Sequence, residues 1–323
     1  RYIEREVLRV LRSRWGEYVS CRELAEVLGV SKALVSRAVT ALRRRGMPIA
    51  VDRRRGYLLI REDDLSKVSS YLQILEVVSS MRYEVVFYER CGRSSQDIAA
   101  EIVRSGGVEG TVVLCESMEG GRGRLGRSWY APSGGLWFTV VLRPRRIPML
   151  HLLSLCAGIA VAEAINELLD VEVRLKWPND VVYRGRKLCG VLVEAEAEAD
   201  VVKFVLVGIG INVNNELPEQ LREKAVALRD IVGTSIPRVP LLLAVLAKLA
   251  NLYRDLAVGR YDDIISKWKA LSDTLGKLVE VHTVDGEVVR GRAVDVDSYG
   301  RLVVVRDGER IVVDAGDVVH LQG

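Results

Sequence analysis

Residues 121–127 read GRGRLGR, which places three glycines and three arginines in one short segment. The glycine spacing matches GxGxxG, a pattern that must open a helix in a dinucleotide-binding fold. The next residues, 128–135, read SWYAPSGG, and Pro132 with the paired glycines excludes a helix there. No acidic residue stands near Val141 to hold a ribose. The segment therefore does not predict a dinucleotide-binding turn.

The same segment can instead bind phosphate. Arginine offers a fixed fork of donors that matches phosphate oxygens, and glycine lets the backbone close around an anion. Such a loop can be disordered when empty and fold over a nucleotide. We expect Arg122, Arg124 and Arg127 to meet phosphate, although a surface loop that happens to be basic has the same residues.

A second candidate site is the segment 176–180, which reads KWPND. We expect Lys176 to leave a strand beside a rigid Trp-Pro turn, where its ammonium can neutralise a carboxylate or a phosphate. An ordinary Asn-Asp turn beside a core tryptophan has the same residues, so this segment alone leaves both interpretations open.

Histidine and cysteine offer little chemistry in this chain. With three histidines, histidine-based catalysis is a weak expectation. The five cysteines are scattered, with no CxxC pair and no neighbouring histidine. This spacing argues against a zinc site and a disulfide framework, and it favours a reducing cytosol. We accordingly expect a cytoplasmic protein.

Apolar segments do not predict a membrane protein. No uninterrupted apolar stretch reaches the roughly 18 residues that a membrane span needs. Residues 1–14 carry charges among their apolar side chains, unlike a secretory signal. A chain of 323 residues is long for one domain and suits two or three.

The net charge of +4 is unevenly distributed. Residues 1–60 hold 14 Lys and Arg against 6 Asp and Glu, a charge of +8, so residues 61–323 carry −4. Positive charge concentrated at one end is typical of a segment that meets phosphate, although a solvated basic surface has the same composition.

The first sixty residues predict a winged helix-turn-helix. An amphipathic helix is expected over 3–14, a second after Ser20 with a capping box to Glu23, and a third from Ser31 to about Arg45. Residues 48–60 then predict a two-stranded ribbon with arginines in its turn. A purely structural three-helix module is the alternative. If the domain binds DNA, the residues that face it are Lys32, Ser36, Arg37, Arg53, Arg54 and Arg55.

The remaining chain must supply the scaffold for the two candidate segments. Residues 62–82 predict a linking helix, and strands and helices alternate after it. Strands are expected near 83–88, 111–116, 136–142, 171–176, 188–195 and 202–208. Helices are expected at 95–105, 149–169 after Pro148, 239–257 and 261–271. The last fifty residues predict short strands at 278–284, 287–296, 301–306, 310–314 and 317–321, which favour a small closed barrel of the SH3 type.

Four motifs stand in an order and spacing that resemble biotin–protein ligases. They are GRGRLGRSW at 121–129, KWPND at 176–180, GRKLCGVLVE at 185–194 and GIGINVN at 208–214. With its flanking domains, the chain resembles the repressor-type members of that family over almost its whole length. The resemblance implies an α+β multidomain protein: a winged helix-turn-helix at 1–62, a linker helix at 63–82, a central α/β catalytic domain at 83–272 and an SH3-like β-barrel at 273–323.

The resemblance also implies a reaction in two steps. Biotin and ATP, with Mg²⁺, give biotinyl-5'-adenylate, and the biotin is then transferred to a lysine of a biotin carboxyl carrier protein. Neither step needs a covalent enzyme nucleophile, since positioning and charge neutralisation can supply most of the acceleration. Further implied partners are a DNA operator, which the protein binds as a biotin-responsive repressor, and a second subunit. Exposed strand edges such as 136–142 are candidate surfaces for pairing two subunits.

Site residues follow from the motif positions. The resemblance implies that Lys176 and Arg124 are catalytic and that Asp180 is the first carboxylate to consider for Mg²⁺. The biotin-binding residues it implies are Ser94, Ser95, Gln96, Met118, Arg122, Gly123, Lys176, Gly190 and Leu192. Those implied for ATP or the adenylate are Arg122, Arg124, Arg127, Trp129, Asn179, Lys187 and Asn212, with Trp129 at the adenine end.

Two positions depart from the family pattern. The family usually has Ser-Thr-Asn where this chain has Ser94-Ser95-Gln96, and it favours glutamine where Met118 stands. Both departures bear on biotin affinity more than on the reaction. Two other functions remain open: a lipoate–protein ligase, whose usual glycine-rich histidine motif is absent here, and a transcription factor whose ligand domain has lost catalysis.

Overall fold

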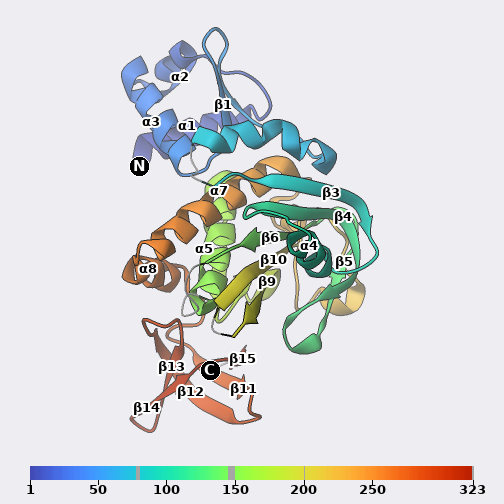
Figure 1. Ribbon diagram of the computed structural model, residues 1–323. Coiled ribbons are helices and arrows are strands. Elements are labelled where there is room, and N and C mark those ends of the chain that lie inside the picture. The colour runs from blue at the N-terminus through green and yellow to red at the C-terminus, as the bar shows by residue number, and fades with distance from the viewer. Residues whose placement is uncertain (78–80, 145–149, 200, 322–323) are drawn as a thin grey trace.

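The computed structural model describes residues 1–77, 81–144, 150–199 and 201–321. Three β-sheets organise these residues: a two-stranded one near the N-terminus, a large central one and a five-stranded one near the C-terminus (Figure 1). Pro148 and the expected start of its helix at 149 lie outside the described residues.

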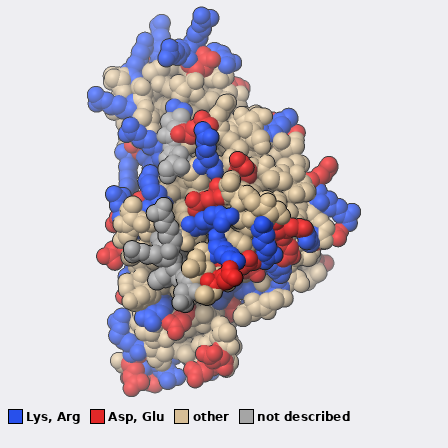
Figure 2. Space-filling model, viewed as in Figure 1, with Lys and Arg blue, Asp and Glu red and all other residues tan. Residues whose placement is uncertain are grey.

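The N-terminal head has the predicted helices and ribbon. Its elements are α1 (Tyr2–Ser13), α2 (Cys21–Leu28), α3 (Lys32–Arg44), β1 (Ile49–Asp52) and β2 (Gly56–Leu59). The hydroxyls of Ser20 and Ser31 cap α2 and α3 by accepting from Glu23 N at 3.1 Å and Leu34 N at 3.2 Å. The predicted capping box is wrong in its second half, because the Glu23 carboxylate accepts from Arg14 at 2.5 Å instead. Lys and Arg predominate over the tip of the head (Figure 2).

The linking segment is helical in a different way from the prediction. Residues Leu65–Val77 form 3₁₀ turns (η1) rather than an α-helix. Ahead of η1, Asp63 accepts from Arg238 Nε at 2.9 Å, and the same guanidinium donates to Glu116 of β4 at 2.9 Å. Arg45 at the end of α3 binds Glu4 at 2.6 Å and Glu167 at 2.7 Å. The head is therefore tied to the central domain by partly buried ion pairs.

The central sheet runs in the order β3-β4-β6-β10-β9-β8-β7, with β5 beside β4. Its strands are β3 (Glu84–Cys91), β4 (Thr111–Arg122), β5 (Ser128–Ala131), β6 (Leu136–Leu142), β7 (Arg174–Lys176), β8 (Asp180–Tyr183), β9 (Arg186–Glu198) and β10 (Val201–Ile211). Strands β3 and β4 are parallel, and the other pairs are antiparallel. Sequence reasoning missed β5 and β8, each of which is only four residues long.

Helices cover both faces of this sheet (Figure 1). On one face lie α5 (Leu150–Leu169), α7 (Arg238–Ala257) and α8 (Tyr261–Leu271), and on the other lies α4 (Ser95–Arg104). Neighbouring residues of β4 serve the two layers alternately: Val112 and Leu114 join the large core, and Val113 and Cys115 join the core under α4. Short segments complete the domain: η2 (Arg124–Gly126), η4 (Glu219–Leu221) and α6 (Leu228–Val232).

Strand β6 is not an exposed edge, contrary to the sequence-based expectation. It lies between β4 and β10, and all seven of its residues are buried. Its apolar run LWFTVVL lacks alternation because both faces are covered by helices. A second subunit cannot pair with this strand while the sheet is intact.

Helix α5 contains one apolar stretch, His151–Leu169, that is long enough to cross a membrane by length and composition. In the structure 78% of the tested window is buried inside the protein. A buried position against α7 and the central sheet accounts for its apolar composition without a membrane.

The C-terminal segment forms the five predicted strands. They are β11 (Leu278–Thr283), β12 (Val288–Val296), β13 (Leu302–Arg306), β14 (Glu309–Val313) and β15 (Gly316–His320), in the antiparallel order β14-β13-β12-β11-β15. Strands β14 and β15 stand at the two ends of this order. Among the described residues they are not hydrogen-bonded to each other, so the sheet is not closed into a continuous barrel. The small β domain lies at the end of the central domain opposite the N-terminal head (Figure 1).

Candidate active site

A single cavity of about 870 Å³ gathers the predicted ligand-binding residues. It is lined by the start of α4, the end of β4, the arginine loop (residues 121–127), the turn between β7 and β8, and the middle of β9 and β10. All sixteen residues predicted for catalysis, biotin, ATP or metal line it: Ser94, Ser95, Gln96, Met118, Arg122, Gly123, Arg124, Arg127, Trp129, Lys176, Asn179, Asp180, Lys187, Gly190, Leu192 and Asn212. A drug-sized or nucleotide-sized molecule fits a cavity of this size.

The turn 176–180 is fixed by the C-terminal β domain. Trp177 is 2% exposed; its backbone N–H donates to Thr274 Oγ1 and its indole Nε1 donates to the Gly300 carbonyl, each at 3.0 Å. The Trp177–Pro178 peptide bond is cis. These contacts hold the residues on either side of Trp177 in place, so Lys176 at the end of β7 faces the cavity from a rigid support.

Lys176 is a cation without a fixed partner. Across the described part of the chain its Nζ makes no hydrogen bond and no ion pair, although it lines the cavity and is partly buried. Burial lowers the pKa of Lys176, and the charge of Asp180 opposes that effect. A desolvated ammonium that is not neutralised by the protein attracts an anionic ligand strongly.

The arginine loop packs against the C-terminal β domain. Strand β4 extends to Arg122, farther than predicted, and β5 follows at once. Arg124 Nη1 donates to the Gly316 carbonyl at 3.1 Å and lies 3.6 Å from Asp317, which also binds Arg127. Burial lowers the pKa of Arg124. Contacts with β15 therefore hold the loop over the cavity.

Sequence reasoning missed these contacts with the C-terminal domain. His282, Asp317, Val318 and Val319 line the cavity although they lie in a separate sheet. Nothing in the local sequence around Asp317 indicates a site, because its partners precede it by about 190 residues. Only the folded arrangement brings them together.

Trp129 lies against a floor made by two glycines. Gly190 and Gly210 are paired across β9 and β10, and a Cβ added to either would lie 2.9 or 2.8 Å from the indole. Any larger residue at these positions would displace the ring. Lys187 Nζ lies 5.2 Å from the centre of the indole, and it forms an ion pair with Asp180 at 2.8 Å. The motif glycines thus provide space for an aromatic ring.

Asn179 and Asn212 are both buried at the cavity wall. Asn179 Nδ2 donates to the Val191 carbonyl, and Asn212 Oδ1 accepts from Asn215 at 3.1 Å. The contact with Asn215 uses only the oxygen of the Asn212 amide, so the amide nitrogen of Asn212 takes no part in it. These two residues anchor the turn after β7 and the end of β10.

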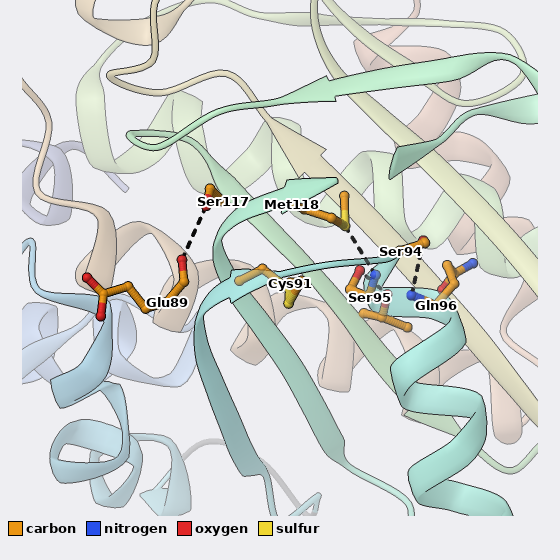
Figure 3. The surroundings of a disulfide bond; sticks show 9 residues. Glu89, Cys91, Ser94, Ser95, Gln96, Ser117 and Met118 are labelled. Atoms are coloured by element: carbon orange, nitrogen blue, oxygen red, sulfur yellow. Dashed lines mark hydrogen bonds between the residues drawn. A yellow bond between two sulfur atoms is a disulfide. The ribbon is translucent and has the colours of Figure 1, made fainter. Parts of the chain in front are cut away.

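The start of α4 is joined to β4 and β6 at the opposite wall. Ser94 caps the helix, Ser95 Oγ is 2.8 Å from Thr139 Oγ1, and Ser95 N donates to the sulfur of Met118 at 3.1 Å (Figure 3). Met118 therefore contacts the backbone at the first residue of α4. Gln96 Nε2 donates to the Leu192 carbonyl at 3.2 Å and to Glu194 Oε2 at 2.9 Å.

A disulfide lies near the start of α4, contrary to the expectation drawn from the cysteine spacing. Cys91 at the end of β3 is bonded to Cys115 in β4 (Figure 3). The two residues are 24 positions apart and meet only because β3 and β4 are adjacent, so no local pattern indicates this pairing. Cys21, Cys156 and Cys189 are free. The bond joins β3, the strand before Ser94, to β4, the strand that also carries Met118.

The described residues do not form a metal centre built from protein ligands alone. Within residues 1–77, 81–144, 150–199 and 201–321 there is no group of three or more His, Cys, Asp or Glu arranged to hold a metal ion. Asp180 lines the cavity and is already paired with Lys187. One carboxylate beside phosphates is an arrangement that Mg²⁺ commonly uses, because this ion keeps several waters.

The predicted DNA-facing residues lie together on the head. All six are exposed: Lys32, Ser36, Arg37, Arg53, Arg54 and Arg55. The first three follow one face of α3, and the arginines form the turn between β1 and β2. Arg55 is partly neutralised by Asp52 at 3.2 Å and stacks 3.9 Å above the Tyr18 ring.

Comparisons with known proteins match all three regions. The family described as "Biotin/lipoate A/B protein ligase family" matches residues 89–212, "Biotin protein ligase C terminal domain" matches 274–321, and "HTH domain" matches 4–58. "Bifunctional ligase/repressor BirA" of Bacillus subtilis is 29% identical over 94% of each chain. "Biotin--[acetyl-CoA-carboxylase] ligase" of Mycobacterium tuberculosis is 34% identical, over 72% of this chain and 86% of its own length.

Solved structures agree with these matches. The biotin protein ligase of Aquifex aeolicus in complex with biotin and ATP superimposes with a TM-score of 0.66 and 28% identity. The superposition covers 74% of this chain and 99% of that one.

Proposed function

The chain belongs to the biotin–protein ligase family, and from this premise we propose that it is an ATP-dependent ligase that makes biotinyl-5'-adenylate and transfers the biotin to a lysine of a biotin carboxyl carrier protein. The observation that carries this proposal is the single cavity of about 870 Å³ in which all sixteen predicted ligand residues meet. The N-terminal head of the chain is a DNA-binding domain of the kind found in the family's bifunctional ligase/repressors.

In the first step a biotin carboxylate oxygen attacks the α-phosphorus of ATP, and pyrophosphate leaves. Two anions must approach each other, so the main requirement is positive charge without a competing partner. Lys176 meets this requirement because no protein anion holds its ammonium among the described residues, and its support at Trp177 keeps it in place. A preorganised charge of this kind typically lowers the activation barrier by about 3–4 kcal/mol.

The arginine loop would then retain the adenylate. Arg124 and Arg127 line the cavity, as Lys187 does, and their contacts with Gly316 and Asp317 hold the loop against β15. We assign the triphosphate end to these residues and the adenine end to Trp129 and Asn212. Biotin is assigned to the wall formed by Ser94, Ser95, Gln96, Met118, Gly123, Gly190 and Leu192, with Arg122 at its edge.

Magnesium would accompany ATP and neutralise its phosphates. Asp180 is the carboxylate best placed to bind the ion beside the phosphates, after exchanging its contact with Lys187. In the second step the carrier lysine attacks the acyl carbon of the mixed anhydride, and AMP leaves. No residue of this chain needs to become covalently attached.

The head and a second subunit complete the proposal. Exposed Lys32, Arg37 and Arg54 support contact with phosphates and groove edges of a DNA operator. For dimerisation we propose the outer half of β9, residues 191–198, which pairs with β10 but extends past its β8 contacts. Light scattering at rising concentration of protein with biotin and ATP should show dimers; a monomer throughout would contradict this part.

The ligase proposal is tested with the carrier protein. Incubation with biotin, ATP, Mg²⁺ and a carrier domain should raise the carrier mass by one biotin, and a carrier whose acceptor lysine is changed to arginine should gain nothing. Transfer of lipoate rather than biotin would favour a lipoate ligase. No transfer of either acid would support a DNA-binding protein without catalysis.

A further inference from the structure

Two buried polar atoms in the cavity wall have no hydrogen-bond partner. Among the described residues, the side-chain atoms in this condition are Arg43 Nε, Gln96 Oε1, Trp129 Nε1 and Asp273 Oδ2, and the second and third belong to residues that line the cavity. Gln96 is 3% exposed. Burial of a carbonyl oxygen without a hydrogen bond is unfavourable, so a ligand that donates a hydrogen bond to Gln96 Oε1 would offset that cost.

The orientation of the Gln96 amide is determined by its neighbours. Its Nε2 donates to the Leu192 carbonyl at 3.2 Å and to a carboxylate oxygen of Glu194 at 2.9 Å. Both partners are acceptors only. If the amide were reversed, Oε1 would face two oxygens and both hydrogen bonds would be lost. The free atom is therefore the oxygen, an acceptor that lies against Gly208 of β10.

Glu194 makes this selection from outside the main cavity. It does not line the cavity of about 870 Å³ but lines a neighbouring one of about 570 Å³, which shares Gln96 and Arg122 with the first. The same Oε2 that accepts from Gln96 also accepts from Arg122 Nη2 at 3.0 Å, and Arg122 Nη1 binds Asp97 at 2.5 Å. One carboxylate thus holds both the amide and the first arginine of the loop.

We propose that Glu194 is a positioning residue for biotin specificity: it holds the Gln96 amide with Oε1 available to accept a hydrogen bond from a ureido N–H of biotin. This inference rests on the proposed function, since it presumes that biotin occupies the cavity. Biotin's ureido ring carries two N–H donors. An amide that is held with its oxygen facing the ligand favours such a donor over an acceptor. The longer side chain of Gln96, where the family usually has asparagine, needs such support because it has one more rotatable bond.

The test is Glu194→Gln, which keeps the size but removes the acceptor-only character. A glutamine at 194 can donate as well as accept, so the Gln96 amide loses its preferred orientation. In biotin-dependent pyrophosphate exchange we expect KM for biotin to rise about tenfold, while KM for ATP and kcat stay within about twofold. Biotin methylated on a ureido nitrogen should be rejected by the wild type, for at least one of the two nitrogens, and less strongly by the variant.

Glu196→Gln is the matched control. Glu196 lies two residues further along β9, lines the same smaller cavity and is paired with Arg104, but it does not contact Gln96 or Arg122. Its substitution should leave all three kinetic constants unchanged. Gln96→Met, which removes the acceptor itself, should reproduce the rise in KM for biotin, and adding Glu194→Gln to it should have little further effect.

The outcomes separate the two proposals. If the wild type exchanges pyrophosphate with biotin but Glu194→Gln keeps its KM for biotin, or raises the KM values for biotin and ATP equally, the role of Glu194 is refuted and the ligase proposal stands. If the wild type shows no exchange with biotin, the proposed function fails and the assignment of Glu194 fails with it.

Discussion

Loss of the Cys91–Cys115 bond should destabilise the central domain without changing any other atom. Reduction gives this perturbation cleanly, because both sulfurs stay in place and only the covalent link is removed. The two residues are 1% and 0% exposed, so the protein should be unfolded in reductant and refolded with the reductant present. Two thiols of the reductant are oxidised to a disulfide as Cys91 and Cys115 are reduced to thiols.

The magnitude follows from the length of chain that the bond closes. For the 24-residue separation, the entropy of loop closure in the unfolded chain amounts to about 3 kcal/mol at 25 °C. In a domain of roughly 150–250 residues each kcal/mol changes Tm by about 2–4 °C. We therefore expect reduction to lower the Tm of the central domain by about 6–12 °C.

Calorimetry and thiol titration measure the two sides of this prediction. The unreduced protein, unfolded in denaturant, should show three reactive thiols from its five cysteines, and the reduced protein five. A variant with Cys91→Ala and Cys115→Ala should have a Tm that no longer responds to reductant. Five thiols without reduction, or a Tm that reduction changes by less than about 2 °C, would refute the reasoning.

Three further predictions concern the site and the head. Lys176→Ala should lower kcat for pyrophosphate exchange about 10²–10³-fold, because one preorganised charge is lost. Burial lowers the pKa of Lys176, so wild-type activity should decline with rising pH at a lower pH than it would with an ordinary lysine. Lys176→Arg should move this decline to higher pH. Gly190→Ala should reduce exchange at least tenfold with little change in Tm, since the new methyl group would lie 2.9 Å from the Trp129 ring; unchanged exchange would mean that the ring is free to move. DNA binding should weaken steeply with salt, and Arg54→Ala should reduce the slope of log K against log salt by about 1, whereas a salt-independent affinity would remove the phosphate contacts from the account.

Local signals in the sequence predicted most of the elements well. Ser20 and Ser31 are caps because their hydroxyls replace partners that helix N-termini lack, and this rule needs only neighbouring residues. Hairpin turns such as 285–286 and 307–308 similarly separate the short C-terminal strands. Most of the predicted cavity residues could be found because they belong to four motifs with a recognisable order; Ser94, Ser95, Gln96 and Met118 lie outside these motifs and came from the resemblance to the family.

Contacts between distant segments were not predictable in this way. The Cys91–Cys115 pairing depends on β3 and β4 being neighbours. The ion pair between Asp317 and the arginine loop depends on how the C-terminal domain packs. Strand β6 was misjudged as an edge because an apolar run of seven residues does not reveal which strands flank it. The support that Glu194 gives to Gln96 was also invisible, since the two residues are 98 positions apart.

Pyrophosphate exchange with purified protein tests the central claim most directly. With ATP and Mg²⁺, labelled pyrophosphate should enter ATP only when biotin is added; lipoate should give no exchange, and Lys176→Ala should reduce the biotin-dependent rate at least a hundredfold. Exchange that is absent with biotin, that is as fast with lipoate, or that survives in Lys176→Ala would contradict the account of this cavity as a biotin-adenylating site.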